Sequence, residues 1–209
     1  MAERMAELYD ERAKQPPKFD LLSMLAHGPA TQDMPLREFM GNLALLIVGG
    51  NDTTRNSMTG GLYALSEHPR EYQKLRDDPS LVTSLVPEII RYVTPVIHMR
   101  RTATQRAELG GKHIRTGDKV VMWYVSGNRD PDAIDDPDNF IIDRPRPRQH
   151  LSFGFGIHRC VGNRLAELQL RILWEEILKR DLEIEVMDRP TYLRSNLIHG
   201  VRELPVQIH

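Results

Sequence analysis

The first third of the chain places apolar residues at helical spacing. Residues 1–27 hold two apolar clusters separated by Gln15-Pro16-Pro17, which predicts two short helices, the second ended by Gly28-Pro29. From Asp33, the expected N-cap, the pattern continues to Pro69 and predicts one helix about 50 Å long. Two adjacent glycines in its middle, Gly49-Gly50, cost roughly 2 kcal/mol relative to alanines, so we expect the helix to need a bare backbone there.

The second third predicts shorter elements. One helix should run from Pro69 to Asp77, and Ser80 should cap the next, which continues to Tyr92. Pro87 inside it predicts a kink or a late start. Residues 100–124 predict strands, with hairpin turns at 110–111 and 116–117.

The last third predicts an irregular stretch, a helix and a terminal strand. Residues 128–150 are rich in Pro, Asp and Arg and form the meander, the irregular stretch of the chain. Residues 163–180 have helical spacing, and 197–208 predict a β-turn and a strand. The fold class expected is therefore mainly α with a small antiparallel β appendage.

Composition narrows the function classes only slightly. The 209 residues are 40% hydrophobic and 27% charged, with a net charge of −1, so nothing in the total points to nucleic acid or an anionic membrane. One cysteine excludes an internal disulfide and fits a reducing compartment. The N-terminus lacks the apolar core of a secretory leader, and the apolar run 43–48 is too short to span a bilayer. We expect a cytoplasmic protein.

The only cysteine, Cys160, lies in the stretch 153–162 with Gly154, Gly156 and Gly162. The glycines predict a tight loop that approaches something flat and bulky. The helix that follows would stabilise a thiolate with its N–H groups and dipole. An anionic sulfur of this kind suits a haem ligand. Taken alone, a lone cysteine is more often a small buried hydrophobe.

The order F-G-x-G-x-H-x-C-x-G over Phe153–Gly162 resembles the haem-binding loop of the cytochrome P450 superfamily, the haem-thiolate monooxygenases. The resemblance implies haem b with an axial thiolate from Cys160. Because members are roughly twice as long, residues 1–209 would be the C-terminal portion of one domain whose N-terminal half is absent. The other haem-binding residues implied are Phe153, Gly154, Gly156, His158, Gly162, Arg101, Gly49 and Gly50.

The stretch Gly49–Thr54 resembles the acid–alcohol motif of the family's long helix. A hydroxyl at Thr53 would hold oxygen or a water, and Asp52 would relay protons from solvent, as oxygen cleavage requires. Polar surface explains the motif equally well when it is taken alone.

Glu88 and Arg91 form an E-x-x-R pair on one helical face. On an exposed helix such a pair contributes a few tenths of a kcal/mol. The resemblance implies instead a buried structural triad, with Arg144 of an F-x-x-x-R segment as the third member, that positions the cysteine loop.

Substrate and partners are implied less directly. The residues at 46–57 and 94–101 resemble those of bacterial alkane and fatty-acid terminal hydroxylases. Core packing alone would give the same apolar residues at the expected lining positions. The expected lining residues are Leu45, Val48, Val96, Ile97, Leu197 and Ile198. A basic surface would dock an acidic ferredoxin, itself reduced by an NAD(P)H-dependent reductase. The arginines near the thiolate are Arg144, Arg146, Arg148, Arg159 and Arg164; part of this set serves the fold, and the remainder would form the dock.

Two other classes remain open at this point. One is a haem-binding or electron-transfer module without oxygenation, against which Asp52 and Thr53 argue, since it needs no proton relay. The other is a non-functional fragment with an incomplete haem cage.

Overall fold

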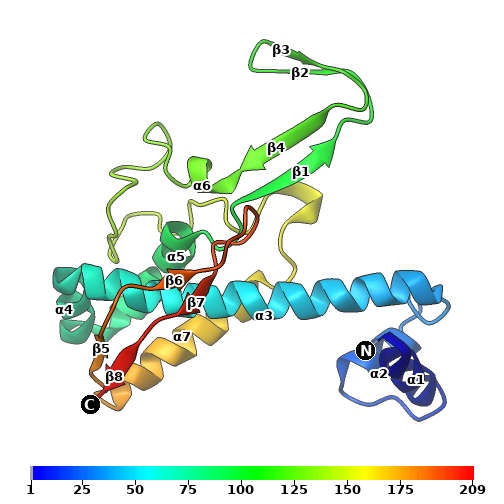
Figure 1. Ribbon diagram of the computed structural model, residues 1–209, viewed down its shortest axis with the longest axis horizontal. Helices are drawn as coiled ribbons and strands as arrows, with labels where there is room; N and C mark the ends of the chain where they lie inside the picture. The colour runs from blue at the N-terminus through cyan, green and yellow to red at the C-terminus, as the bar shows by residue number, and fades with distance from the viewer. Residues whose placement is uncertain (1) are drawn as a thin grey trace. The chain divides into compact units, whose positions relative to one another are not determined.

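The computed structural model describes residues 2–209 and divides into two compact units, the first ending at Asn51 and the second beginning at Asp52. The first unit holds helix α1 (Ala2–Ala13), helix α2 (Leu21–His27) and the first half of α3 (Leu36–Glu67), which continues into the second unit (Figure 1). At 1.5 Å per residue, the 32 residues of α3 span about 48 Å, as the apolar periodicity predicted.

In the first unit, side chains close the ends of the short helices. Asp20 caps α2 by accepting the Ser23 N–H at 2.8 Å, and the Tyr9 ring lies 4.3 Å from that of buried Phe39. The expectation that Asp33 caps α3 was wrong. The backbone N–H of Phe39 donates to the Pro35 carbonyl at 2.9 Å, so the helix begins directly after that proline.

The second unit contains most of the helices. Asp78, rather than the expected Ser80, is the capping residue here, because its carboxylate accepts both the backbone N–H and the hydroxyl of Ser80. Of the two alternatives expected at Pro87, a kink or a late start, the late start is excluded, since the helix continues through that residue. The helices are the rest of α3, α4 (Pro69–Asp77), α5 (Val82–Val93), α6 (Tyr124–Gly127) and α7 (Asn163–Lys179), with single 3₁₀ turns at η1 (Pro79–Leu81) and η2 (Gly156–His158).

The core of the second unit lies where α3, α4, α5 and α7 meet, and Trp174 and Ile89 are among its fully buried members. The contact between α3 and α5 depends on Gly60 and Gly61. A methyl group added at Gly60 would lie 2.7 Å from the Val93 side chain, and one at Gly61 would lie 2.7 Å from that of Ile89. A larger residue at either position would force the Val93 or Ile89 side chain, or α5 itself, to move.

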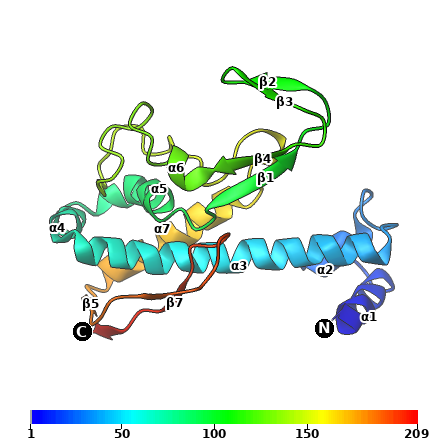
Figure 2. The same ribbon diagram turned by 45° about the horizontal axis from the view of Figure 1, so that its top comes forward.

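Four two-stranded antiparallel ladders complete the fold. Figure 2 shows the β2–β3 hairpin beyond the end of the β1–β4 ladder. The ladders are β1 (His98–Thr102) with β4 (Lys119–Trp123), β2 (Ala107–Leu109) with β3 (Lys112–Ile114), β5 (Ile184–Val186) with β8 (Val206–Ile208), and β6 (Thr191–Tyr192) with β7 (Val201–Glu203).

The mainly helical fold with a small antiparallel β part confirms the predicted class. Gly110-Gly111 does turn a hairpin, but Thr116-Gly117 does not, because β4 pairs with β1 rather than with β3. Strands β5 and β6 were not predicted. Within the described residues, no helix combines the length and the apolar character needed to cross a bilayer.

Candidate active site

Cys160 lies on the loop between the meander and α7, and its side chain is exposed. The interpretation of this residue as a small buried hydrophobe is therefore wrong. Its backbone N–H donates to the Phe153 carbonyl at 2.8 Å and closes the loop at its base. Helix α7 begins three residues later, at Asn163, as the sequence predicted.

The glycines of this loop are required for different local reasons. Gly154 and Gly156 have φ angles of +68° and +76°, in the left-handed region that favours glycine. A methyl group at Gly154 would also lie 3.0 Å from the Tyr124 hydroxyl, and one at Gly162 would lie 4.0 Å from the Cys160 Sγ. The loop thus keeps its backbone close to its neighbours and leaves the sulfur uncovered.

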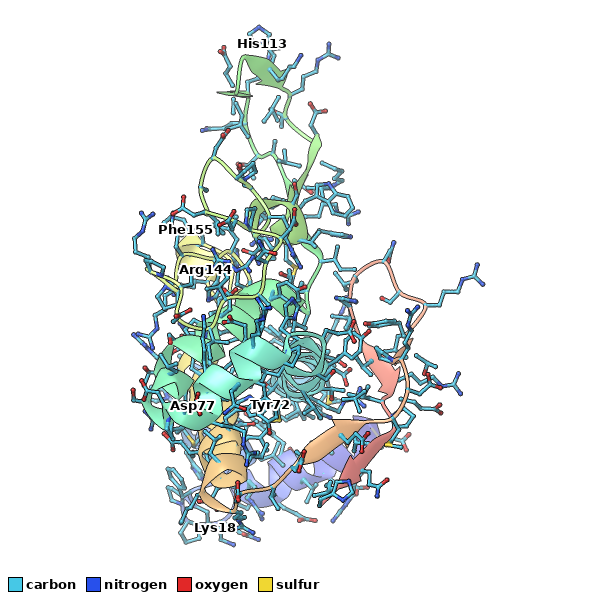
Figure 3. All side chains as sticks on the ribbon, turned by 90° about the vertical axis from the view of Figure 1, so that its left-hand side faces the viewer. Lys18, Tyr72, Asp77, His113, Arg144 and Phe155 are labelled. Carbon is cyan, nitrogen blue, oxygen red and sulfur yellow. The ribbon has the colours of Figure 1, made fainter. Side chains whose placement is uncertain are left out.

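Three apolar side chains around the cysteine also point away from the protein. Phe155, Ile157 and Val161 are 85%, 98% and 90% exposed. Figure 3 labels Phe155 on this loop and Arg144 on the meander before it. Large apolar side chains exposed together are a surface that an apolar group can cover.

Below the loop, Glu88 and Arg91 of α5 and Arg144 of the meander form one buried ion cluster. Arg91 donates to both carboxylate oxygens of Glu88 at 2.8 Å, and Arg144 Nε donates to one of them at 3.1 Å. Glu88 and Arg91 are fully buried, and Arg144 nearly so. The pair is therefore not the solvated surface pair that its spacing alone would also permit.

The two arginines of this cluster also fix the meander. Arg91 donates to the carbonyls of Asn128, Pro137 and Asn139 at 2.7–3.0 Å. Arg144 donates to the carbonyls of residues 135, 136 and 139. The meander has no regular secondary structure, so these side-chain bonds satisfy its backbone.

Asn128, which the sequence analysis missed, connects this cluster to the cysteine loop. Its Nδ2 donates to the hydroxyls of Thr94 and Ser152, both at 2.8 Å, and its Oδ1 accepts the Leu151 N–H at 2.6 Å. Ser152 in turn donates to the Ile90 carbonyl at 2.7 Å. A single asparagine in a loop has no local pattern that would reveal these contacts.

His150 lies just before the loop and packs on Phe153, with ring centroids 5.5 Å apart. Burial above all, together with the charges of Arg159, Arg91 and Arg148, lowers the pKa of His150 to about 4. The imidazole is therefore neutral at pH 7.

On α3, Asp52 pairs with Arg55 through an Oδ1–Nη2 distance of 3.2 Å, and the Asp52 side chain is half exposed. Thr53 follows it, partly buried. In the first unit, Gly49, Gly50, Leu45 and Val48 are exposed, and a methyl group at either glycine would meet nothing within 4 Å among the described residues.

The structure brings the four expected lining residues of the second unit into two adjacent segments. The Ile97 N–H donates to the Leu197 carbonyl at 2.9 Å, and Val96 forms a β-bridge with Ile198. Arg101 lies on β1 opposite Val120 and is partly buried. Arg100 is its neighbour on the strand and points to the opposite face.

Of the five arginines near the cysteine loop, Arg144 is buried in the ion cluster, as the structural triad requires, and the other four are exposed. Arg148 and Arg164 both pair with Glu167, at 3.2 and 3.4 Å. They line a cleft of about 320 Å³ together with Val86 and Leu168. The remaining members, Arg146 and Arg159, are also exposed, as is His158.

The residues present fit a haem group. One exposed sulfur lies on a glycine-containing loop whose apolar side chains Phe155, Ile157 and Val161 are also exposed. A flat macrocycle with a central metal needs a single soft ligand and an apolar seat, and the loop offers both. A mainly helical fold with such a loop is typical of haem proteins with a thiolate ligand.

The profile of the cytochrome P450 family matches residues 1–198, and the chain belongs to that family. Linalool 8-monooxygenase from Pseudomonas putida is 43% identical over 96% of the chain and 49% of its own length. The methyl-branched lipid omega-hydroxylase of Mycobacterium tuberculosis is 39% identical over 90% of the chain and 44% of its own length.

A solved structure, cytochrome P450-153 from Novosphingobium aromaticivorans, is 50% identical with a TM-score of 0.94 and is matched by all of this chain over 52% of its own. The chain thus spans about half the length of the relatives it matches.

Proposed function

We propose that the chain is the thiolate-bearing, C-terminal portion of a haem-thiolate monooxygenase domain. Its reaction would insert one oxygen atom of O2 into an unactivated C–H bond. The observation that carries the proposal is the exposed Cys160, on a loop that follows the meander fixed by the buried Glu88 cluster. Membership of the cytochrome P450 family supports it. The reducing cytoplasm would keep the thiol available.

Haem bound at Cys160 would supply oxygen activation and electron transfer. The chain would contribute one sulfur ligand, and it would hold the loop that carries this ligand in place through Asn128 and the Glu88 cluster. His158 and Arg101 would provide cationic or hydrogen-bonding partners for the two propionates.

Protons would reach the distal side through α3. Asp52 is half exposed and can exchange protons with solvent, while Thr53 beside it is partly buried. A carboxylate that reaches water next to a partly buried hydroxyl can pass protons inward. Gly49 and Gly50 would keep the helix backbone bare one turn earlier.

The proposed substrates are unbranched apolar chains, alkanes or fatty acids, oxidised at the terminal carbon. Val96, Ile97, Leu197 and Ile198 offer an apolar lining, joined by the backbone contacts between their segments. The names of the two relatives, for a terpene alcohol and for omega-hydroxylation of a branched lipid, support an apolar substrate with an accessible chain end.

The electron donor proposed is a ferredoxin with its NAD(P)H-dependent reductase. Arg148 and Arg164 on the cleft between α5 and α7, with Arg146 and Arg159 nearby in sequence, offer positive charge for an acidic partner.

The test uses the haem-loaded enzyme and a Cys160→Ser variant. The parent should show the red-shifted band of a reduced, carbon-monoxide-bound thiolate haem and convert n-octane to 1-octanol. Replacing the thiolate by a hydroxyl should abolish both, because a hydroxyl does not push electron density onto the iron as a thiolate does. A variant that keeps the band would refute the ligand assignment. A parent that oxidises only bulky polar molecules would refute the substrate class.

A further inference from the structure

The C-terminal turn 197–201 is attached along one side to the segment that links α5 to β1. The His199 N–H donates to the Pro95 carbonyl at 2.9 Å, and His199 Nδ1 lies 3.1 Å from the Val93 carbonyl oxygen. With the Ile97–Leu197 bond, these contacts fix the register of the two segments. These contacts reach α3 only indirectly, through the packing of Val93 on Gly60.

A second attachment, made by a side chain, joins the turn to α3. Asn56 Oδ1 accepts the backbone N–H of Val201 at 2.9 Å, across 145 residues of sequence. Because that N–H can only donate, the amide oxygen must face it, and the orientation of the Asn56 amide is fixed. Both residues are buried, so the bond is shielded from competition with water.

Gly200 packs closely against this attachment. A methyl group at Gly200 would lie 3.3 Å from Asn56 Nδ2 and 2.7 Å from Leu193 Cδ1, so the turn sits directly against the amide. The Leu193 N–H donates to the Gly200 carbonyl at 2.8 Å and holds the turn from the other side. We call the contact among Asn56, Gly200 and Val201 the amide seam.

The amide seam lies one helical turn after the proposed proton relay. Asn56 follows Asp52 by four residues and Thr53 by three, and residues at these spacings are neighbours on a helix surface. At its other end the seam holds the turn that carries Leu197 and Ile198. It is therefore a direct side-chain bond between the relay helix and the substrate-lining turn.

We propose that Asn56 is a positioning residue that sets the site of oxidation along the substrate chain. It does so by fixing the distance of Leu197 and Ile198 from the relay face of α3. This inference rests on the proposed function. Displacements of about 1 Å far from the chemistry can change rates by about 10²-fold, so a shifted turn should change which carbon reacts.

The test compares two substitutions that disturb the seam from opposite sides, in the haem-loaded enzyme. Asn56→Leu keeps the branching at Cγ and the number of side-chain heavy atoms and removes the acceptor, while Gly200→Ala inserts a methyl group against the seam. Both should change the ratio of 1-octanol to 2-octanol from n-octane by about fivefold or more, which corresponds to roughly 1 kcal/mol. The carbon-monoxide band should stay at parental intensity.

Two further variants separate positioning from structural support. Asn56→Asp keeps the accepting oxygen and should restore the parental product ratio. Asn42→Leu removes an asparagine from the same helix whose Nδ2 donates to the Glu38 carbonyl at 3.0 Å and to Met34 Sδ at 3.2 Å, both within the first unit, and should leave the ratio unchanged. Amide hydrogen exchange at Val201 should be fast in Asn56→Leu and slow in Asn42→Leu.

The outcomes distinguish the two proposals. If the parent hydroxylates octane but both seam variants keep its product ratio, the positioning role is wrong and the proposed function stands. Loss of the carbon-monoxide band in both variants would make the seam a support of the fold only, which also overturns the role. If the parent binds haem yet forms no alcohol, the proposed function fails, and this inference fails with it.

Discussion

Replacing Glu88 with glutamine tests whether the buried ion cluster holds the cysteine loop. The Glu88 carboxylate accepts four hydrogen bonds, two from Arg91, one from Arg144 and one from the Ile141 backbone N–H at 2.9 Å. Glutamine keeps the volume and one accepting oxygen. It leaves two buried guanidinium groups without any carboxylate.

The expected loss follows from the burial of all three side chains. Removing one partner from a buried ion pair costs about 3–5 kcal/mol, a large part of the roughly 5–15 kcal/mol that stabilises a domain. Thermal unfolding followed by circular dichroism should show a midpoint about 10 °C lower in Glu88→Gln. Haem should dissociate before the helices unfold, because the meander and the loop lose their anchor first.

A matched control lies on α7, where Arg171 and Glu175 form an ion pair at 3.4 Å with both side chains about half exposed. Glu175→Gln makes the same chemical change at a solvated pair and should cost less than about 0.5 kcal/mol. Equal midpoint shifts in the two variants would refute the reasoning. So would a Glu88→Gln enzyme that retains haem as the parent does.

Three further predictions concern proton supply, pH and electron delivery. Asp52→Asn should slow turnover by about 10²-fold, and Thr53→Ala should divert electrons to hydrogen peroxide. The measurement in both variants is the product formed per reduced cofactor consumed. An unchanged ratio in both would exclude the relay. His150 is neutral when folded and takes up a proton on unfolding below pH about 6.5. The free energy of unfolding should therefore fall by about 1.4 kcal/mol for each unit by which the pH is lowered, from pH about 6.5 to about 4. In denaturant titrations, His150→Phe should reduce this slope, and an unaltered slope would rule out the effect. Arg148→Glu should lower the association rate of an acidic ferredoxin and its salt dependence while leaving the haem spectrum intact; a salt-independent parent would contradict the docking surface.

The apolar periodicity and the residues that begin or end helices predicted the helices well, because each of these features is local. The apolar spacing from Leu36 to Glu67, the prolines at 69 and 79 and Gly28 all act within one turn of the chain. The caps were less predictable. Asp78 and Ser80 both favour a helix start, and only the backbone path determined that Asp78 accepts the bonds.

The site was predictable only where its residues form a motif. Cys160 and its glycines are close in sequence, so their spacing is informative. Asn128 and Asn56 bond to partners 24 and 145 residues away, and nothing in their flanking residues shows those contacts. The same limit explains the pairing error at Thr116-Gly117, since the partner of β4 is β1, on the far side of the hairpin.

The absence of side chains at Gly60 and Gly61 has a consequence for how mutations would spread through the second unit. Ile89, against which Gly61 packs, is the immediate neighbour of Glu88 on α5. A methyl group added at Gly61 would press on the Ile89 side chain, one residue along α5 from the carboxylate that holds the two meander-fixing arginines. A glycine-to-alanine change on α3, far in sequence from Cys160, would therefore reach the anchor of the meander through the packing of two helices rather than through any polar contact.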